Sequence, residues 1–309
     1  MALHPNFPNS PHEILDPSVR WFPADEALRE SSYEKLLPPL VHQLRKKVHE
    51  WRNANYSGAS DTSVALLHWW FKTEHLLPSS DGLMKPFQYY FAQREALETI
   101  VYLYDVVGLK DKYDLLRFDS SGAVSANMFD ETWRRLVVKM ATGTGKTKVM
   151  SLALAWCYFH KLYEPDSDLA RNFLVVAPNI IVLDRLRADF DGLKIFFEDP
   201  VLPDNGFEGR NWRDDFQLTL HIQDEVHVTR KTGNIFLTNI HRVYSGNDVV
   251  PSADDQDTMG YFLGKRPVGA TTDSKVDLGD IVRDIDELVV INDEAHHVHN
   301  EKLAWFKSI

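Results

Sequence analysis

A glycine-rich turn between an apolar run and a helix constrains this chain more than any other feature of its sequence. The apolar run is Leu-Val-Val-Lys-Met at residues 136–140, and the turn is Ala-Thr-Gly-Thr-Gly-Lys-Thr at residues 141–147. Residues 136–140 have the pattern of a buried strand, and residues 148–160 have the pattern of a helix. The chain is therefore expected to pass from a strand through a tight turn into a helix N-terminus.

The composition of this turn is typical of a loop that binds phosphate groups. Gly143 and Gly145 have no side chains, so consecutive backbone N–H groups can surround a polyphosphate at the N-terminus of the following helix. Lys146 can reach the outer phosphates, and the Thr147 hydroxyl can bind Mg²⁺. The full pattern G-x-x-x-x-G-K-[ST] has a glycine where this chain has Met140. A plain strand-to-helix turn with an incidental lysine is the alternative, and the flanking pattern disfavours it.

A second signal is the stretch Glu-Leu-Val-Val-Ile-Asn-Asp-Glu-Ala-His-His at residues 287–297. A continuous apolar strand brings Asp293 and Glu294 to its carboxyl end. In an enzyme with a phosphate-binding loop, an aspartate at this place holds Mg²⁺, and the adjacent glutamate can orient and deprotonate the attacking water. The two signals together indicate an enzyme that hydrolyses a nucleoside triphosphate.

Two other patterns in the sequence are weaker signals. Residues 224–227 repeat the spelling D-E-x-H, but they follow a stretch of alternating polarity that suits a half-exposed strand and not a buried central one. His296, His297 and His299 suggest zinc, yet no cysteine or second cluster of ligands lies near them in sequence. We therefore expect no zinc site here.

The order of the remaining elements predicts an α/β fold. Residues 171–178 have a buried-strand pattern followed by a helix over 180–190, and residues 233–239 form a second short strand. This alternation implies a parallel sheet with helices on both faces, whose ligands bind at the carboxyl ends of the strands. Residues 216–228 suit a partly exposed strand pair, and residues 245–279 have the composition of a long insertion.

The region before residue 84 has a different pattern. Residues 1–30 are rich in proline and are expected to form an extended arm, and amphipathic periodicity from Ser32 to Trp51 predicts a helix. A second helix, over residues 64–71, is expected to pack against the first. We place a boundary near residue 84, so that residues 1–84 form an arm and helical region and residues 85–309 form the main domain.

Another helix begins near residue 93 and runs through residue 104. The amide of Gln93, at its start, can read the donor and acceptor edge of an adenine, and Gln88 is the competing candidate.

Charge and cysteine content restrict the setting. The net charge of −11 argues against wholesale electrostatic attraction to nucleic acid, although it leaves room for a local groove. Cys157 is the single cysteine, so the chain can form no internal disulfide, and its place inside an apolar helix suits a small buried side chain. No run approaches the ~18 apolar residues of a membrane span. We expect a cytoplasmic protein without membrane contact.

The motifs can be compared with those of a known group of proteins. Residues 140–147 and 293–296 resemble motifs I and II of superfamily 2 DEAD/DEAH-box helicases and translocases. Residues 91–96 are similar to the glutamine motif of that group, which favours Gln93 over Gln88. Residues 176–179 resemble motif Ia, and residues 237–241 resemble the DNA-contacting motif that follows it. The whole order most resembles the Res subunit of type III restriction systems, over about residues 84–309.

This resemblance implies a RecA-like P-loop NTPase domain of an ATP-dependent DNA helicase or translocase that uses ATP and Mg²⁺. Double-stranded DNA and a methylase or specificity subunit are the implied partners. The residues implied around the nucleotide are Gln93 for adenine, Thr142, Gly143, Thr144, Gly145 and Lys146 for the phosphates, Thr147 and Asp293 for Mg²⁺, Glu294 for the water, and His296 for coupling to the motor. Those implied along the nucleic-acid backbone are Pro178, Asn179, Thr238 and Asn239.

The sequence also departs from that group. Such motors have two RecA-like domains, and the second supplies an arginine that can contribute roughly 10³–10⁵ in rate. This sequence ends at Ile309, soon after motif II, so we expect it to bind nucleotide, to hydrolyse it slowly and not to unwind DNA alone.

Two other functions are compatible with a phosphate-binding loop. The first is a standalone nucleotide-binding module, or an inactive fragment, that a separate partner chain completes. The second is a small-molecule kinase, which has no need of Ala295 and His296 after its acidic pair.

Overall fold

The computed structural model describes residues 8–17, 40–119, 121–122, 124–125, 136–141, 143–222, 229–239 and 285–293. The chain divides into two compact units, Met1–Ala153 and Leu154–Ile309. The division falls inside α6 (Lys146–Tyr163). This helix directly follows the glycine-rich turn, as the sequence predicts. Among the described residues, no helix combines the length and the apolar character needed to cross a membrane.

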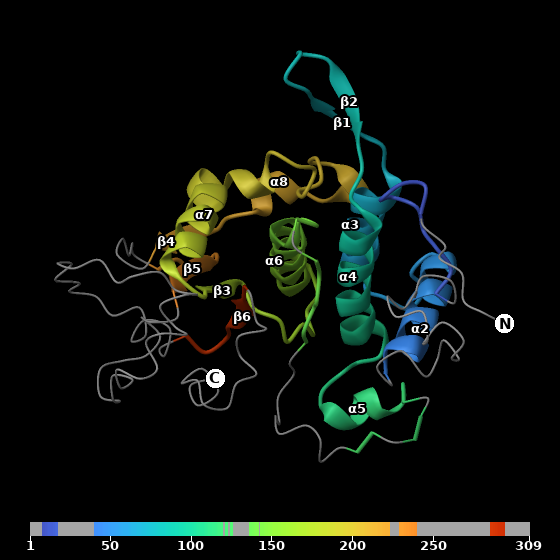
Figure 1. Cartoon of the computed structure of the whole chain (residues 1–309). Helices are drawn as coiled ribbons and strands as arrows, with labels where there is room; N and C mark the ends of the chain where they lie inside the picture. Colours follow the sequence, from blue (N-terminus) through green and yellow to red (C-terminus); the bar gives the residue numbers. More distant parts are fainter. Residues whose placement is uncertain are drawn as a thin grey trace, which may run out of the picture. The chain divides into compact units, whose positions relative to one another are not determined.

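Three helices form the centre of the first unit (Figure 1). They are α2 (Val41–Asn53), α3 (Asp61–Lys72) and α4 (Phe91–Val101), and both α2 and α3 pack against α4. The Ser60 hydroxyl caps α3 by accepting a hydrogen bond from the Ser63 N–H. Helices on both sides of residue 84 thus pack together in this unit. The domain boundary expected near residue 84 stays a prediction.

The N-terminal arm contacts the start of α4. The Pro11 carbonyl accepts a hydrogen bond from the Phe91 N–H at 2.8 Å, and His12 Nδ1 lies 3.1 Å from the Tyr89 carbonyl oxygen. These bonds tie a segment far away in sequence to the first turn of α4.

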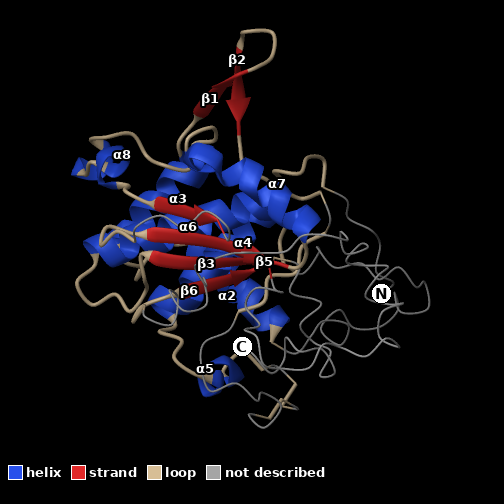
Figure 2. Ribbon diagram, turned by 90° about the vertical axis from the view of Figure 1, so that its left-hand side faces the viewer, coloured by secondary structure: helices blue, strands red, loops and turns tan. Residues whose placement is uncertain are grey.

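A β-hairpin connects α3 to α4 (Figure 2). Its strands are β1 (His75–Pro78) and β2 (Met84–Phe87), and residues 79–83 form its turn. After α4 the chain forms a π-helical turn, Tyr102–Val106, and then the short helix α5 (Lys112–Leu116). The sequence pattern did not indicate the hairpin, because its strands have only four residues each.

The second unit is built on a four-stranded parallel sheet, drawn as arrows in Figure 2. The strands lie in the order β4 (Thr219–Ile222), β5 (Asn234–Asn239), β3 (Asn172–Ala177), β6 (Val289–Asn292). All six residues of β5 are buried, as are five of the six in β3. The predicted α/β fold with a parallel sheet is thus confirmed.

Helices and aromatic side chains complete the core of this unit. Helix α7 (Ile180–Phe190) follows β3 and packs on β3 and β5, over the residues that the sequence predicts. Short helix α8 (Trp212–Asp215) is joined to α6 by the Tyr158 hydroxyl, which donates to the Asp215 carbonyl at 2.8 Å. The Trp212 and Phe159 rings lie 4.9 Å apart, edge to face.

One expectation about strands was wrong. Residues 136–140 form no strand, and Leu136, Val137 and Val138 are 40%, 56% and 38% exposed. A strand requires a neighbour for its backbone N–H and C=O groups, and within the described part of the chain none pairs with these residues. Of the strand pair expected over residues 216–228, the described residues include β4, which is parallel to β5. Residues 223–228 lie outside the described residues, so the second strand stays a prediction.

Candidate functional site

The glycine-rich turn leads directly into the N-terminus of α6 in the first unit. Gly143 and Gly145 both have φ of +79°, in the left-handed region that favours glycine. The Thr144 hydroxyl donates to the Ala141 carbonyl at 2.7 Å, which closes the turn. Because the first N–H groups of a helix have no intrahelical acceptor, the turn ends in a cluster of donors suited to an anion.

Lys146 and Thr147, the first two residues of α6, are half-buried. Thr142 lies outside the described residues. The described part of the turn has two glycines with positive φ, and phosphate binding by this turn stays a prediction.

Gln93 lies against this turn. Its side chain is buried, with 2% of the residue exposed, whereas Gln88 is exposed. Gln93 Nε2 donates to the Thr144 carbonyl at 2.9 Å, and its Oε1 accepts from the Tyr90 N–H at 2.9 Å. Both ends of the amide thus bond to protein backbone. Contact with adenine stays a prediction.

The packing between Gln93 and the turn leaves no room for a side chain at Gly145. A Cβ atom placed there would lie 2.3 Å from Gln93 Nε2. The glycine is therefore required both by its positive φ and by the close approach of the amide.

Asp293 directly follows β6 in the second unit. It is 6% exposed, and its N–H donates to the Val176 carbonyl at 3.0 Å. Its Oδ2 accepts a hydrogen bond from Arg185 Nη2 of α7 at 3.1 Å. A carboxylate held at a strand end is a suitable ligand for Mg²⁺, and here an arginine supplies the neighbouring positive charge. Glu294 and His296 lie outside the described residues, as do His297 and His299.

The positions expected along nucleic acid meet at the same edge of the sheet. In the parallel registers Val176 is opposite both Thr238 and Asn292, so the strands end together. Thr238 and Asn239 are buried, 2% and 4% exposed, and Pro178 is buried as well. Contact of these side chains with a nucleic-acid backbone stays a prediction.

Asn179 has a structural bond of its own. Its Oδ1 accepts a hydrogen bond from the Val182 N–H at 2.9 Å and so caps the N-terminus of α7. An asparagine directly before a helical pattern is a recognised cap signal, and it was available from the sequence.

Sequence reasoning missed two residues beside Asp293. The structure pairs Arg185 with the Asp293 carboxylate. Asn292 Oδ1 is buried and has no hydrogen-bond partner among the described residues. A polar residue at the end of an apolar strand was the available signal for Asn292. The Arg185 pair spans 108 positions of sequence and had no such signal.

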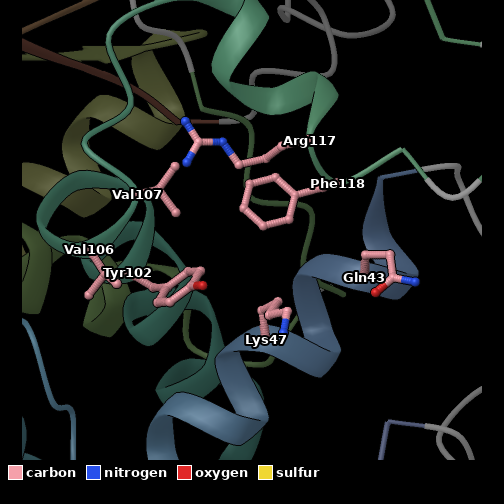
Figure 3. Close-up of a pocket in the computed structure, with 7 residues that line it drawn as sticks. All are labelled: Gln43, Lys47, Tyr102, Val106, Val107, Arg117 and Phe118. Atoms are coloured by element: carbon pink, nitrogen blue, oxygen red, sulfur yellow. The ribbon is translucent and has the colours of Figure 1, made fainter.

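The first unit also contains a cavity of about 220 Å³ on the side of α2 and the π-helical turn (Figure 3). Its two cations are already paired, Lys47 with Glu50 and Arg117 with Asp114, both at 2.9 Å. The wall is made of Gln43, Lys47, Tyr102, Val106, Val107, Arg117 and Phe118. None of the described residues of the glycine-rich turn lines it, so this cavity is distinct from the candidate phosphate site.

Comparison with known proteins identifies a family. No curated protein and no solved structure matches the chain. The family described as "Type III restriction enzyme, res subunit" matches residues 87–309, which include the glycine-rich turn, the parallel sheet and Asp293. The chain belongs to this family of type III restriction enzyme Res subunits, whose members are ATP-dependent, helicase-like motors of restriction systems.

Proposed function

We propose that this chain carries the ATP-binding half of a DNA helicase or translocase motor in a restriction-modification or related DNA-processing system. The observation that carries the proposal is the conformation of the turn, with Gly143 and Gly145 in the left-handed region directly before α6. Such a turn binds the phosphates of a nucleotide through backbone N–H groups and the positive end of the helix dipole.

Each residue has a distinct role in this proposal. The Lys146 ammonium group neutralises the β- and γ-phosphates, and Gln93 holds the turn and reads the adenine. Thr147 and Asp293 would hold Mg²⁺, which when bound neutralises charge on the phosphate oxygens. Glu294 takes the proton of the attacking water, and His296 couples the nucleotide to the motor.

The edge formed by the carboxyl ends of β3 and β5 faces the DNA in this proposal. Pro178, Asn179, Thr238 and Asn239 lie there. Hydrolysis requires an arginine from a second RecA-like domain, whether that domain belongs to the same protein or to a partner chain. Double-stranded DNA and a methylase or specificity subunit are the proposed partners.

Substitution of the lysine tests the nucleotide site. Lys146→Ala removes the ammonium group that neutralises the phosphates, so the affinity for MgATP should fall at least about tenfold. Isothermal titration calorimetry measures it. Lys139→Ala is the matched control, because Lys139 is an exposed lysine just ahead of the same turn. Equal affinities of the Lys146→Ala variant and the native chain would refute the proposal.

The second candidate function, a module completed by a separate chain, is favoured if ATP hydrolysis appears only after another RecA-like chain is added. DNA should then stimulate hydrolysis by the completed protein. If no nucleic acid changes its nucleotide affinity or turnover, the small-molecule kinase becomes the better hypothesis.

A further inference from the structure

The helices before residue 87 lie outside the family match, and the proposed function gives them no role. A buried group of charged and polar side chains joins them to α4. We call it the Glu98 cluster, and its members are Arg52, Tyr56, Arg94 and Glu98. Arg52 belongs to α2 and Tyr56 to the turn after it, whereas Arg94 and Glu98 belong to α4.

Glu98 is the centre of this cluster and is 0% exposed. Its Oε2 accepts a hydrogen bond from Arg52 Nε at 2.7 Å, and Arg52 Nη2 lies 2.5 Å from the same oxygen. Its Oε1 accepts from the Tyr56 hydroxyl at 2.6 Å and from Arg94 Nε at 2.7 Å. Arg94 Nη2 donates in turn to the Tyr56 hydroxyl at 2.9 Å. Both carboxylate oxygens are thus bound from fixed directions.

The backbone around Tyr56 indicates that its position is strongly determined. Tyr56 has φ of +62°, a conformation that a bulky side chain rarely adopts, and the residue is fully buried. Burial, together with the neighbouring Glu98 carboxylate, raises the pKa of Tyr56, so the phenol keeps its proton and remains a donor at neutral pH. Such strain persists only where the surrounding contacts hold the residue in place.

Helix α4 connects this cluster to the phosphate-binding turn. Gln93 lies in the first turn of α4, and Glu98 lies further along the same helix. The Arg52 guanidinium also lies 5.2 Å from the centre of the ring of Phe91, the first residue of α4. Because an α-helix of this length moves as a rigid element, a rotation or shift at Glu98 would displace the Gln93 amide from the Thr144 carbonyl.

We infer that Arg52 and Tyr56 are positioning residues of the nucleotide site. Through Glu98 they set the orientation of α4, so that Gln93 holds the turn in the conformation that binds phosphate. The helical region ahead of the family match is therefore a functional part of the nucleotide site. The inference rests on the proposed function in one respect, namely that the turn binds a nucleotide.

The test uses the full 309-residue chain with Arg52→Met, Gln93→Ala and the double variant. In nucleotide-free protein, Arg52→Met should speed amide hydrogen exchange in a peptide covering residues 143–149. It should also weaken the binding of a fluorescent ATP analogue about tenfold. The double variant should bind the analogue no worse than Gln93→Ala, because both substitutions act through the contact of Gln93 with the Thr144 carbonyl. Lys47→Met is the control, because it removes a half-exposed ion pair, Lys47 with Glu50, from the same helix α2.

A purely structural role predicts a different result. Arg52→Met would then lower the unfolding midpoint while hydrogen exchange in the turn and nucleotide affinity at lower temperature stay unchanged, and this would overturn the inference. Multiplicative losses in the double variant would overturn it too.

If Arg52→Met does not fold, Tyr56→Phe takes its place, because it removes the hydroxyl with its bonds to Glu98 and Arg94 and keeps the Arg52–Glu98 ion pair. The same changes in exchange and affinity are expected, in smaller measure, and unchanged values would overturn the inference. A native chain that binds no nucleotide, but whose turn exchanges faster in these variants, would refute the proposed function and leave the positioning role supported.

Discussion

At Gly145 a single added carbon atom would disturb the candidate site in two ways. Its φ of +79° disfavours any side chain, and a Cβ would collide with the Gln93 amide. That amide is bonded at both ends, so it cannot move aside without losing its bond to the Thr144 carbonyl. Backbone strain and loss of the contact would therefore occur together.

The substitution Gly145→Ala should reduce nucleotide affinity about tenfold and cost about 1–2 kcal/mol of stability. Gly82→Ala is a close control for strain, because Gly82 has φ of +78° and no atom near the added Cβ. That variant should be destabilised by about 1 kcal/mol and keep its nucleotide affinity. Binding and chemical denaturation curves for the two variants separate the effects. Equal affinities in both would show that the Gln93 contact has no influence on the turn.

Among the elements, α7 shows that a residue expected to contact nucleic acid already has a structural bond. Asn179 uses Oδ1 to cap the helix, and the first residue after it, Ile180, is 49% exposed. The cap satisfies a backbone N–H that would otherwise have no acceptor. Stability and nucleic-acid binding at this position can therefore be measured separately.

Replacing Asn179 by Ala should cost about 1 kcal/mol, because the cap is lost, whereas Asn179→Asp keeps the cap and should be nearly as stable as the native chain. If Asn179 also lies along a nucleic-acid backbone, the new carboxylate of the Asp variant should weaken binding by repelling phosphate. Chemical denaturation and a DNA-binding titration measure the two effects. An Ala variant as stable as the native chain would argue against the capping role, and Asp184→Ala on the exposed side of the same helix is the control.

For the whole molecule, the question is whether the region before the family match can be removed. The first unit has much of its buried apolar surface in α2 and α3, including Val48, Trp51, Leu67 and Trp70. Residues 41–73 also supply two of the three side chains that bind Glu98. Without them a buried carboxylate would keep only Arg94 as its partner.

Deletion of residues 1–80 should therefore prevent cooperative folding of the first unit. Loss of Arg52 alone would cost about 3–5 kcal/mol, the range for breaking a buried ion pair. Differential scanning calorimetry and near-UV circular dichroism of the truncated chain measure the outcome, with Lys47→Met as a control that removes an exposed pair. An intact transition in the truncated chain would contradict the prediction.

Patterns of a few residues were sufficient to predict much of this fold. The apolar period of α7, the run of β3 and the small residues ahead of α6 each follow from backbone sterics and burial within one element. The placement of Asp293 directly after β6 follows in the same way, because the apolar run of that strand stops where the polar residues begin.

Strand pairing and contacts between residues far apart in sequence could not be predicted in this way. Residues 136–140 have the composition of a strand but form none, because composition does not supply a neighbouring strand. The bonds of Gln93 to Thr144, of Arg52 to Glu98 and of Arg185 to Asp293 join residues 51, 46 and 108 positions apart. Such pairs form only when packing brings two elements together, so they are properties of the tertiary structure and leave no periodic signal in the sequence.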